Sequence, residues 1–475
     1  MSRCSSLALF ALVSSLAAGA TAAEPVNAKV FRAGAFAQDI TPTKFPISVN
    51  GGMADRLATG AHDRLHARCL VLDDGSTQIA LVVCDSCMIP REIMDEAKKL
   101  ASKATGILTE HMLISATHTH TAPTATGVFQ SDPDAGYAKY LAEQIAKGIT
   151  QAHANLAPAK IGWGVGREPN QLFNRRWKMK PGSIAADPFG NLTDTVKMNP
   201  GYQAAGLLEA AGPVDPEVSV LSVQTRDGKP LALLANYSLH YVGGVEPLSA
   251  DYFGAFAEQM SELLKADSKF VGILSNGTSG DVNNVNFTSP APGKREPFEQ
   301  IRVVAGAVAR ATLAAQQKID HREWVQLKMV EREIELGVRL PNEKDLERAK
   351  GILAAAKGPV LKGLPEIYAR ETVLLAKYPA TVKAKLQAIR IGELGIASSP
   401  CETFTAIGLS IKQKSPLKPT FTIELANGYN GYLPTPEQHK LGGYETWRAR
   451  SSYLEVTASE KITATLLELL NAVAK

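Results

Sequence analysis

The sequence contains little of what marks membrane-spanning, nucleic-acid-binding or disulfide-rich proteins. Beyond its first residues it has no stretch near the roughly 20 consecutive apolar residues that a transmembrane helix needs. Its formal net charge is only +4 over 475 residues, and the basic residues are scattered, which argues against a nucleic-acid partner. With 45% hydrophobic and 21% charged residues, it has the composition of a globular protein with a large core.

Cysteine is scarce as well. Of the five cysteines, Cys4 lies near the start of the chain, and Cys84 and Cys87 form the only closely spaced pair. Such a pair is compatible with a redox site, a disulfide or half of a metal site. Because no second pair accompanies it, a thiolate zinc site is weakly supported, and a disulfide or two buried thiols is favoured.

The one apolar run stands at the beginning of the chain. Arg3 precedes the apolar residues 7–18, and the small residues 19–23 follow them, which is the layout of a cleaved signal peptide. We therefore predict a leader over residues 1–23 and a mature protein of residues 24–475, exported to the periplasm or secreted. An uncleaved anchor is the alternative, but the run is short for a membrane span.

Strand-like and helix-like patterns alternate along the mature chain, which predicts an α/β fold of mixed sheets with flanking helices. Asp227-Gly228 is a hairpin signal between two of the strands. Residues 178–213 show no periodicity and predict a long surface excursion that lines or covers a site. No internal repeat or linker is evident, so one catalytic domain is expected. The predicted strands are 65–72, 79–84, 112–116, 218–225, 231–237, 270–274, 325–336 and 386–397, and the predicted helices are 91–104, 137–154, 252–264, 298–317, 342–356, 403–412 and 460–473.

The sharpest chemical signal is a pair of histidines where an apolar strand ends. His118 and His120 follow the apolar residues 112–116, and strand alternation would place both imidazoles on one face. Histidine is the commonest protein ligand for zinc, so two of them at this spacing can converge on one metal or one substrate. The alternative is two unrelated polar residues at the end of a strand.

Three further clusters also follow apolar strands. His240 comes after the strand 231–237, and a glycine-rich loop that contains Asp281 follows the strand 270–274. Such a loop is most often a simple turn, although its glycines permit close approach to a ligand. Glu402 precedes the predicted helix 403–412, and its spacing alone favours an acid that interacts with the positive end of the helix dipole.

Taken together, these clusters resemble the neutral, non-lysosomal ceramidases. The resemblance follows the same order along most of the mature chain, and the histidine pair and the Gly-Asp-Val sequence are its most specific parts. The matching stretches are residues 60–68, Thr117 to Pro123, Asn174-Arg175, Asn236 to His240, Ser249 to Asp251, Ser279 to Val282, Pro400 to Glu402 and Asn427 to Glu445.

The resemblance implies one Zn²⁺ per chain and a specific set of side chains around it. The metal ligands that it implies are His118, His240, Glu402 and Tyr432. It further implies that His120, Arg175 and Tyr444 bind the scissile group, and Asp281 is a candidate to orient a ligand histidine. For Arg175 the alternative is a surface cation, and for Tyr444 a half-buried aromatic residue.

The implied activity is hydrolysis of an N-acyl amide, such as the amide of ceramide, by a zinc-activated water. The sequence departs from the family pattern at Asn283, Cys401 and His439, and no immunoglobulin-like domain is expected after residue 473. A related hydrolase acting on another amide or an ester is therefore an alternative. An amidohydrolase barrel is a further alternative, but it is disfavoured because the histidine pair does not lie on the first strand of the fold. An exported binding protein without catalysis is another alternative. Peripheral contact with a membrane is compatible with a lipid substrate.

Overall fold

A computed structural model of the chain describes residues 1, 29–244 and 247–475. The predicted leader therefore lies, except for Met1, outside the described residues. Among the helices of the described part, none is both long and apolar enough to cross a membrane.

The largest sheet has eight strands and both parallel and antiparallel neighbours. Its strands are β1 Arg32–Asp39, β4 His66–Asp73, β5 Gln78–Cys84, β6 Met112–Ala116, β7 Ala157–Arg167, β12 Glu217–Thr225, β13 Pro230–Tyr237 and β14 Val271–Asn276. Their spatial order is β14-β13-β12-β7-β1-β4-β5-β6. Only the outer pairs β13–β14 and β5–β6 are parallel, so β14 ends at the same edge of the sheet as β13, and β6 at the same edge as β5.

A second sheet packs against one face of the first. It consists of β16 Leu327–Gly337, β17 Thr381–Ile391, β18 Leu394–Ser398 and β20 Thr420–Ile423, in that spatial order. Alternate side chains of the two sheets form one buried cluster, to which Leu81, Leu234 and Phe421 belong. Successive side chains of a strand point to opposite faces of its sheet, so every second residue of these strands contributes to the cluster between the two sheets.

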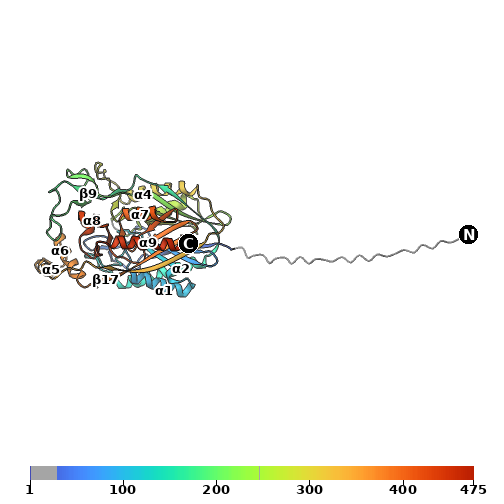
Figure 1. Ribbon diagram of the computed structural model, residues 1–475, viewed down its shortest axis with the longest axis horizontal. Helices are drawn as coiled ribbons and strands as arrows, with labels where there is room; N and C mark the ends of the chain where they lie inside the picture. Colours follow the sequence, from blue (N-terminus) through green and yellow to red (C-terminus); the bar gives the residue numbers. More distant parts are fainter. Residues whose placement is uncertain (2–28, 245–246) are drawn as a thin grey trace.

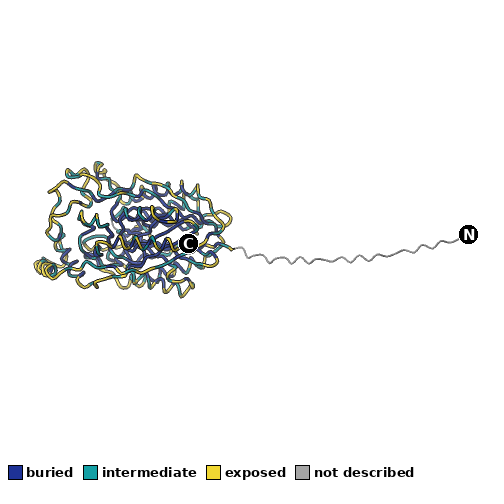
Figure 2. Tube along the Cα trace, viewed as in Figure 1, coloured by how far each residue is buried: buried dark blue, intermediate teal, exposed yellow. Residues whose placement is uncertain are grey.

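Helices cover the outer faces of both sheets, which gives four layers. The helices are α1 Arg91–Thr105, α2 Ala135–Ala154, α3 Asp251–Leu263, α4 Glu299–Gln316, α5 Glu343–Ala355, α6 Leu364–Leu375, α7 Thr405–Lys414, α8 Pro436–Leu441 and α9 Ala458–Ala474, with the 3₁₀ turns η1 Thr109–His111 and η2 Tyr444–Thr446. Helices α1 to α4 pack on the eight-stranded sheet, and α7 and α9 pack on the second sheet. In Figure 1, α9 crosses the middle of the molecule, with α4 above it and α1 and α2 below. The buried trace gathers at the centre in Figure 2.

Short strand pairs complete the fold. They are β2 Ile47–Val49 with β3 Arg56–Ala58, β8 Phe173–Asn174 with β15 Val282–Asn283, β19 Glu402–Thr403 with β21 Tyr432–Leu433, and a small sheet of β9 Arg176–Met179, β10 Val196–Met198 and β11 Leu207–Ala210. The predicted excursion over 178–213 thus contains regular structure that its lack of periodicity did not indicate, because this segment forms two strands of the small sheet. Its Thr195 amide donates to the Leu441 carbonyl, just before η2.

The predicted fold class, mixed α/β with mixed sheets and flanking helices, is confirmed. The Asp227-Gly228 turn joins β12 and β13 as an antiparallel hairpin, as predicted, and Gly228 has φ +85°. Helix α6 and strands β1 and β7 were not predicted.

Replacing Phe421 by alanine is expected to lower the free energy of unfolding by about 3–5 kcal/mol, because this fully buried ring fills the space between the two sheets. The measurement is a chemical-denaturant melt. Leu208, which is 55% exposed on β11, supplies the control, and Leu208→Ala should change stability by less than about 0.5 kcal/mol. Equal losses in the two variants would contradict the packing of the sheets described above.

Candidate metal centre

His118 and His120 converge, but not through strand alternation. Strand β6 ends at Ala116, two residues before His118, so the predicted geometry of an extended strand is wrong here. His118 instead adopts φ +69°, an uncommon left-handed conformation for a residue with a side chain. This bend brings the two Nε2 atoms to 3.2 Å from each other.

His240 joins the pair from the loop that follows β13. Its Nε2 lies 3.2 Å from the Nε2 of His118. The Nδ1 atom of His118 lies 2.8 Å from the Cys87 carbonyl, and that of His240 lies 3.2 Å from the Ser279 carbonyl. Because a carbonyl only accepts hydrogen bonds, both Nδ1 atoms carry hydrogen, so a metal or a further proton would bind at the Nε2 atoms, which face each other.

Glu402 supplies an anionic oxygen to the same point. Its Oε2 lies 3.2 Å from the Nε2 of His118 and is buried without a hydrogen-bond partner among the described residues. The other oxygen, Oε1, accepts a hydrogen bond of 2.9 Å from the hydroxyl of Tyr429. Glu402 lies in β19, three residues before α7 begins, so the alternative of an acid at the helix start is wrong.

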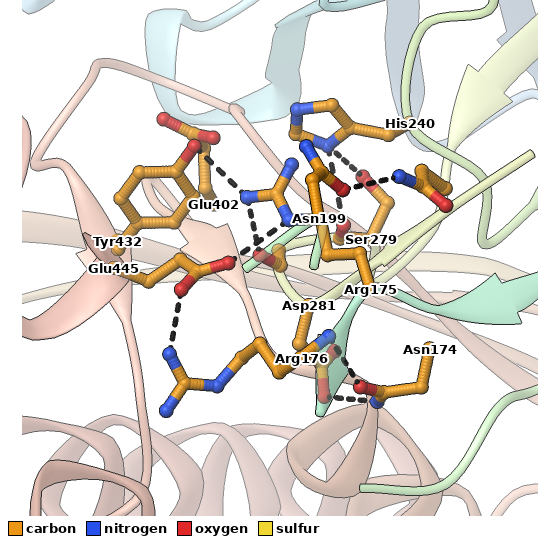
Figure 3. Close-up of polar contacts among 12 residues, drawn as sticks. Asn174, Arg175, Arg176, Asn199, His240, Ser279, Asp281, Glu402, Tyr432 and Glu445 are labelled. Carbon is orange, nitrogen blue, oxygen red and sulfur yellow. Dashed lines mark hydrogen bonds and ion pairs between the residues drawn. The ribbon is translucent and has the colours of Figure 1, made fainter. Parts of the chain in front are cut away.

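Tyr432 is the register partner of Glu402 in the parallel pair β19–β21. Its hydroxyl oxygen accepts a hydrogen bond of 3.0 Å from Nη2 of Arg175. Burial and the charge of Glu402 nevertheless raise the pKa of this phenol well above its ordinary value. Arg175 also donates to the Gly280 carbonyl and the Glu445 carboxylate, and it is only 4% exposed, so it is not a surface cation. Figure 3 shows Arg175 between Tyr432, Glu402 and Glu445.

The charges of this cluster indicate that it attracts a cation. Burial opposes protonation of His118, but Cys87 and Glu402 raise the pKa of His118 well above its ordinary value. Burial and the charges of Arg175 and His118 hold the pKa of His240 well below its ordinary value, so that ring stays neutral. Without a metal, a proton on His118 supplies the positive charge that Glu402 requires.

The donor set fits a zinc ion. The ligand atoms of His118, His240 and Glu402 all lie within 4.8 Å of one another, and all three residues are buried. Two imidazole nitrogens, a carboxylate and a phenol oxygen are ligands that Zn²⁺ accepts in a four-coordinate site. The unpaired Oε2 of Glu402 and the facing Nε2 lone pairs are what a bound cation would satisfy.

A second combination, Cys87 with His118 and His120, fits a metal less well. The Cys87 Sγ faces Nδ1 of His118 at 3.7 Å, but the hydrogen of that nitrogen points to the Cys87 carbonyl. Cys69, Cys84, Cys87 and Cys401 are all free and buried. The Cys84 and Cys87 pair is therefore two buried thiols, which was one of the two favoured alternatives, and not a disulfide.

Comparison with known proteins places the chain in a family. The sequence profile described as "Neutral/alkaline non-lysosomal ceramidase, N-terminal" matches residues 31–292, more than half of the chain. The chain belongs to the neutral/alkaline non-lysosomal ceramidase family. Neutral ceramidase A of Dictyostelium discoideum is 22% identical over 255 residues, which are 49% of this chain and 32% of that relative, so the match spans about a third of its length.

Solved ceramidase structures share the fold. The crystal structure of neutral ceramidase from Pseudomonas aeruginosa has a TM-score of 0.71 at 18% identity, covering 94% of this chain and 75% of that one. A structure titled "Ceramidase complexed with C2" gives the same TM-score at 17% identity and the same coverage. The family match ends at residue 292, before Glu402, Tyr432 and Tyr444, whereas the fold likeness extends over nearly the whole chain.

In this ceramidase-family chain, His120 is held on three sides. Its ring stacks on Tyr241 with centroids 3.6 Å apart, and its carbonyl accepts a hydrogen bond from Arg56. Gly51, at φ +100°, lies so close that an added Cβ would be 2.4 Å from the imidazole. The sequence analysis missed Gly51, Arg56 and Tyr241. The Gly51-Gly52 pair is visible in the sequence, but His120, which Gly51 contacts, lies about 70 residues further along the chain.

Tyr444 borders the centre from η2. Its ring centroid lies 5.7 Å from that of Tyr432 and 6.4 Å from that of Phe129. The next residue, Glu445, is fully buried and paired with Arg175 and Arg176, which anchors the backbone that carries Tyr444. Tyr444 is partly buried, which agrees with the alternative of a half-buried aromatic residue. It nevertheless lies beside the predicted metal ligands.

Asp281 does not orient a ligand histidine, so that prediction is wrong. One carboxylate oxygen accepts hydrogen bonds from the amide and the hydroxyl of Thr405, each 2.8 Å long, at the first turn of α7. The other oxygen accepts from Asn174, as Figure 3 shows. Both histidine Nδ1 atoms are instead occupied by backbone carbonyls. Asp281 thus fastens the loop after β14 to α7 and to the segment that carries Arg175.

Asp251 holds the segment that carries Tyr241, and its charge gives a testable pH dependence. Its carboxylate accepts hydrogen bonds from the amides of Val242 and Gly243, and burial raises its pKa from 3.8 to about 6. The protonated form is therefore favoured in the folded state. This contribution to stability is fully present below pH 4 and is lost as the pH rises through 6.

The metal-free wild type is expected to lose about 3 kcal/mol relative to Asp251→Asn between pH 4 and pH 7, since each pH unit between the two pKa values is worth about 1.4 kcal/mol. Denaturant melts of both proteins at the two pH values measure this difference. A constant difference between the two free energies of unfolding would contradict the shifted pKa.

Proposed function

We propose that this chain is an exported zinc-dependent hydrolase that cleaves an N-acyl amide bond, as its ceramidase relatives are named for doing. The observation that carries the proposal is the meeting of two Nε2 lone pairs and the unpaired Oε2 of Glu402 at one buried point. His118, His240, Glu402 and Tyr432 would hold one Zn²⁺ there. When bound, zinc would activate a water for attack and polarise the carbonyl of the amide.

His120 is suited to move the proton of the reaction. Burial and the charges of His118 and Arg175 hold its pKa well below the ordinary value, so its ring is neutral at neutral pH and one ring nitrogen has a free lone pair. Stacking on Tyr241 and close packing on Gly51 fix the plane of the imidazole. We assign His120 as the base that takes a proton from water and returns it to the leaving amine.

Tyr444 is suited to stabilise the oxyanion that forms when the amide carbonyl is attacked. Burial raises the pKa of its hydroxyl, so the group remains a hydrogen-bond donor. Arg175 was predicted to bind the scissile group as well. Its hydrogen bonds to Tyr432 and Glu445 support a role in holding the ligand Tyr432 and the segment that carries Tyr444.

An apolar cluster beside the centre supports a lipid-like acyl substrate. Tyr429 and Tyr444 pack with Phe129, Tyr368 and Trp447, a set of rings that would favour a hydrocarbon chain over a charged one. Two matched proteins are named as neutral ceramidases, but the sequence match spans only a third of one of them. Ceramide is accordingly the first substrate to test, and peripheral membrane contact would accompany it.

Export is proposed from the leader-like residues 1–23 alone.

The test is to purify the mature protein, measure zinc per chain, and assay a fluorescent N-acyl sphingosine beside simple N-acyl amides and esters. One zinc per chain together with amide hydrolysis that a chelator abolishes is the expected result. Faster turnover of simple amides or esters would favour a related hydrolase with another substrate. Zinc without turnover of any of these compounds would favour a binding protein and contradict the proposed activity.

A further inference from the structure

The segment of residues 424–427, which follows β20, is hydrogen-bonded to the strand before His118, to the residue before Glu402, and to the strand that leads to Ser279, the partner of His240. The amide of Ala116, at the end of β6 before His118, donates to the Leu425 carbonyl. The amide of Leu425 donates to the Cys401 carbonyl, next to Glu402. The amide of Glu424 donates to the carbonyl of Asn276, where the loop that carries Ser279 begins. This segment also leads directly to Tyr429 and Tyr432.

Its backbone conformation is unusual. Leu425 has φ +52° and Asn427 has φ +63°, both in the left-handed region that residues other than glycine rarely adopt. Such a conformation is strained and persists only where the surroundings impose it. Two left-handed residues within three positions indicate that the contacts of this segment determine its backbone conformation.

Glu424 is the charged group of the segment, and it is fully buried. Its carboxylate accepts hydrogen bonds from the amide of Thr403, at 2.7 Å, and from both the amide and the hydroxyl of Ser279. Burial raises the pKa of Glu424 to about 8, although the hydrogen bonds from Ser279 and Thr403 lower it. A carboxylate bound to two separate loops fixes their distance from each other.

Both loops position proposed zinc ligands. Ser279 meets Nδ1 of His240 with its carbonyl at 3.2 Å and its hydroxyl at 3.4 Å, and Figure 3 shows the two residues side by side. Thr403 directly follows Glu402 in β19. The partner of a ligand imidazole sets the orientation of the ring and its basicity, and its loss weakens metal binding.

We propose that Glu424 is a positioning residue of the metal centre, which holds Ser279 and Thr403 so that His240 and Glu402 face the same cation. The proposal rests on the proposed function, because it assumes that His240 and Glu402 bind zinc. Ser279 is the link to the imidazole, and the backbone of Thr403 is the link to the carboxylate ligand.

The test measures zinc affinity rather than turnover. Glu424→Ala removes both acceptor oxygens, so the side chain no longer accepts from either loop. Its zinc Kd, measured by competition with a chromophoric chelator, is expected to rise by on the order of 10- to 100-fold. Ser279→Ala keeps its carbonyl on His240 and loses only the hydroxyl, so a smaller rise is expected. In both variants the visible spectrum of bound Co²⁺ should change, because the ligand geometry changes.

Asp74→Ala is the matched control. Asp74 is also a buried carboxylate that accepts from backbone amides, those of Ser76, Thr77 and Leu327, but it lies at the turn between β4 and β5. Its variant should keep the wild-type Kd within about twofold and the wild-type Co²⁺ spectrum, even where it lowers stability. If the loss of a buried carboxylate acted only through the stability of the fold, the zinc Kd and the Co²⁺ spectrum would change equally in the two variants.

A folded Glu424→Ala protein with the zinc Kd and Co²⁺ spectrum of the wild type would overturn the proposal. If Glu424→Ala does not fold, Ser279→Ala decides: weaker zinc binding and an altered spectrum support the positioning role, and wild-type values overturn it. A wild-type protein that binds no zinc would overturn the proposed function together with this inference. Zinc binding that none of the variants alters would overturn the inference alone.

Discussion

Replacing His240 by alanine is expected to remove bound zinc and to lower amide hydrolysis by more than about 100-fold. Loss of a residue that only hydrogen-bonds to a metal ligand typically lowers metal affinity or activity by about 10- to 100-fold. Loss of a ligand itself should lower them at least as much. His240 is fully buried, and its Nε2 is one of the nitrogens that meet 3.2 Å apart. His118→Ala should behave alike. Metal analysis after dialysis and kcat/KM for the N-acyl substrate measure the two effects.

His321→Ala provides the matched control for this experiment. His321 is a half-buried histidine whose Nε2 contacts the hydroxyl of Ser222, on β12. It takes no part in the cluster of His118, His240 and Glu402. Its replacement should leave the zinc content and kcat/KM at wild-type values. Unchanged zinc in His118→Ala and His240→Ala would remove the assignment of the metal ligands.

Tyr444→Phe is expected to keep bound zinc and to lower kcat by about 10²- to 10³-fold. This is the usual cost of removing one donor that stabilises an oxyanion. The substitution keeps the ring, so the packing of Tyr444 on Tyr432, Phe129 and Trp447 should survive. Steady-state kinetics with zinc analysis of the same preparation separates the loss of a donor from the loss of the metal.

Tyr378→Phe is the control for Tyr444→Phe. Tyr378 packs its ring edge against Tyr453 and is not among the residues proposed to hold zinc or to bind the substrate. Its kcat should equal that of the wild type. If Tyr444→Phe also retains full activity, the hydroxyl of Tyr444 does not act on the reacting carbonyl, and Arg175 would become the stronger donor.

Much of the fold follows from patterns that the sequence displays directly. Strands such as β5 and β13 are continuous apolar runs because both their faces are buried, one by helices and one by the second sheet. The hairpin at Asp227-Gly228 needs only a glycine with positive φ. Helix α6 has a weak amphipathic pattern, and its place depends on tertiary contacts such as those of Tyr368 and Glu371.

The metal centre was harder to predict, because its geometry is set by contacts between distant segments. His118 and His120 were visible as a pair, but their convergence depends on the left-handed backbone of His118, which no periodicity indicates. Glu402 and Tyr432 came from family resemblance alone. They are neighbours only because β19 and β21 pair in parallel across 30 residues of chain.

The supporting residues illustrate the same limit. Asp281 was prominent in a glycine-rich motif, yet its carboxylate binds Thr405 and Asn174. Glu424 carried no local signal, although it lies between the two loops that support His240 and Glu402. A carboxylate that accepts from backbone amides of distant loops is invisible until those loops are placed.

Anomalous diffraction at the zinc edge from crystals of the purified protein tests the metal centre most directly. One strong peak is expected among Nε2 of His118, Nε2 of His240, the carboxylate of Glu402 and the hydroxyl of Tyr432. Zinc-loaded crystals with no peak at this point, or with a peak held by other side chains, would contradict it.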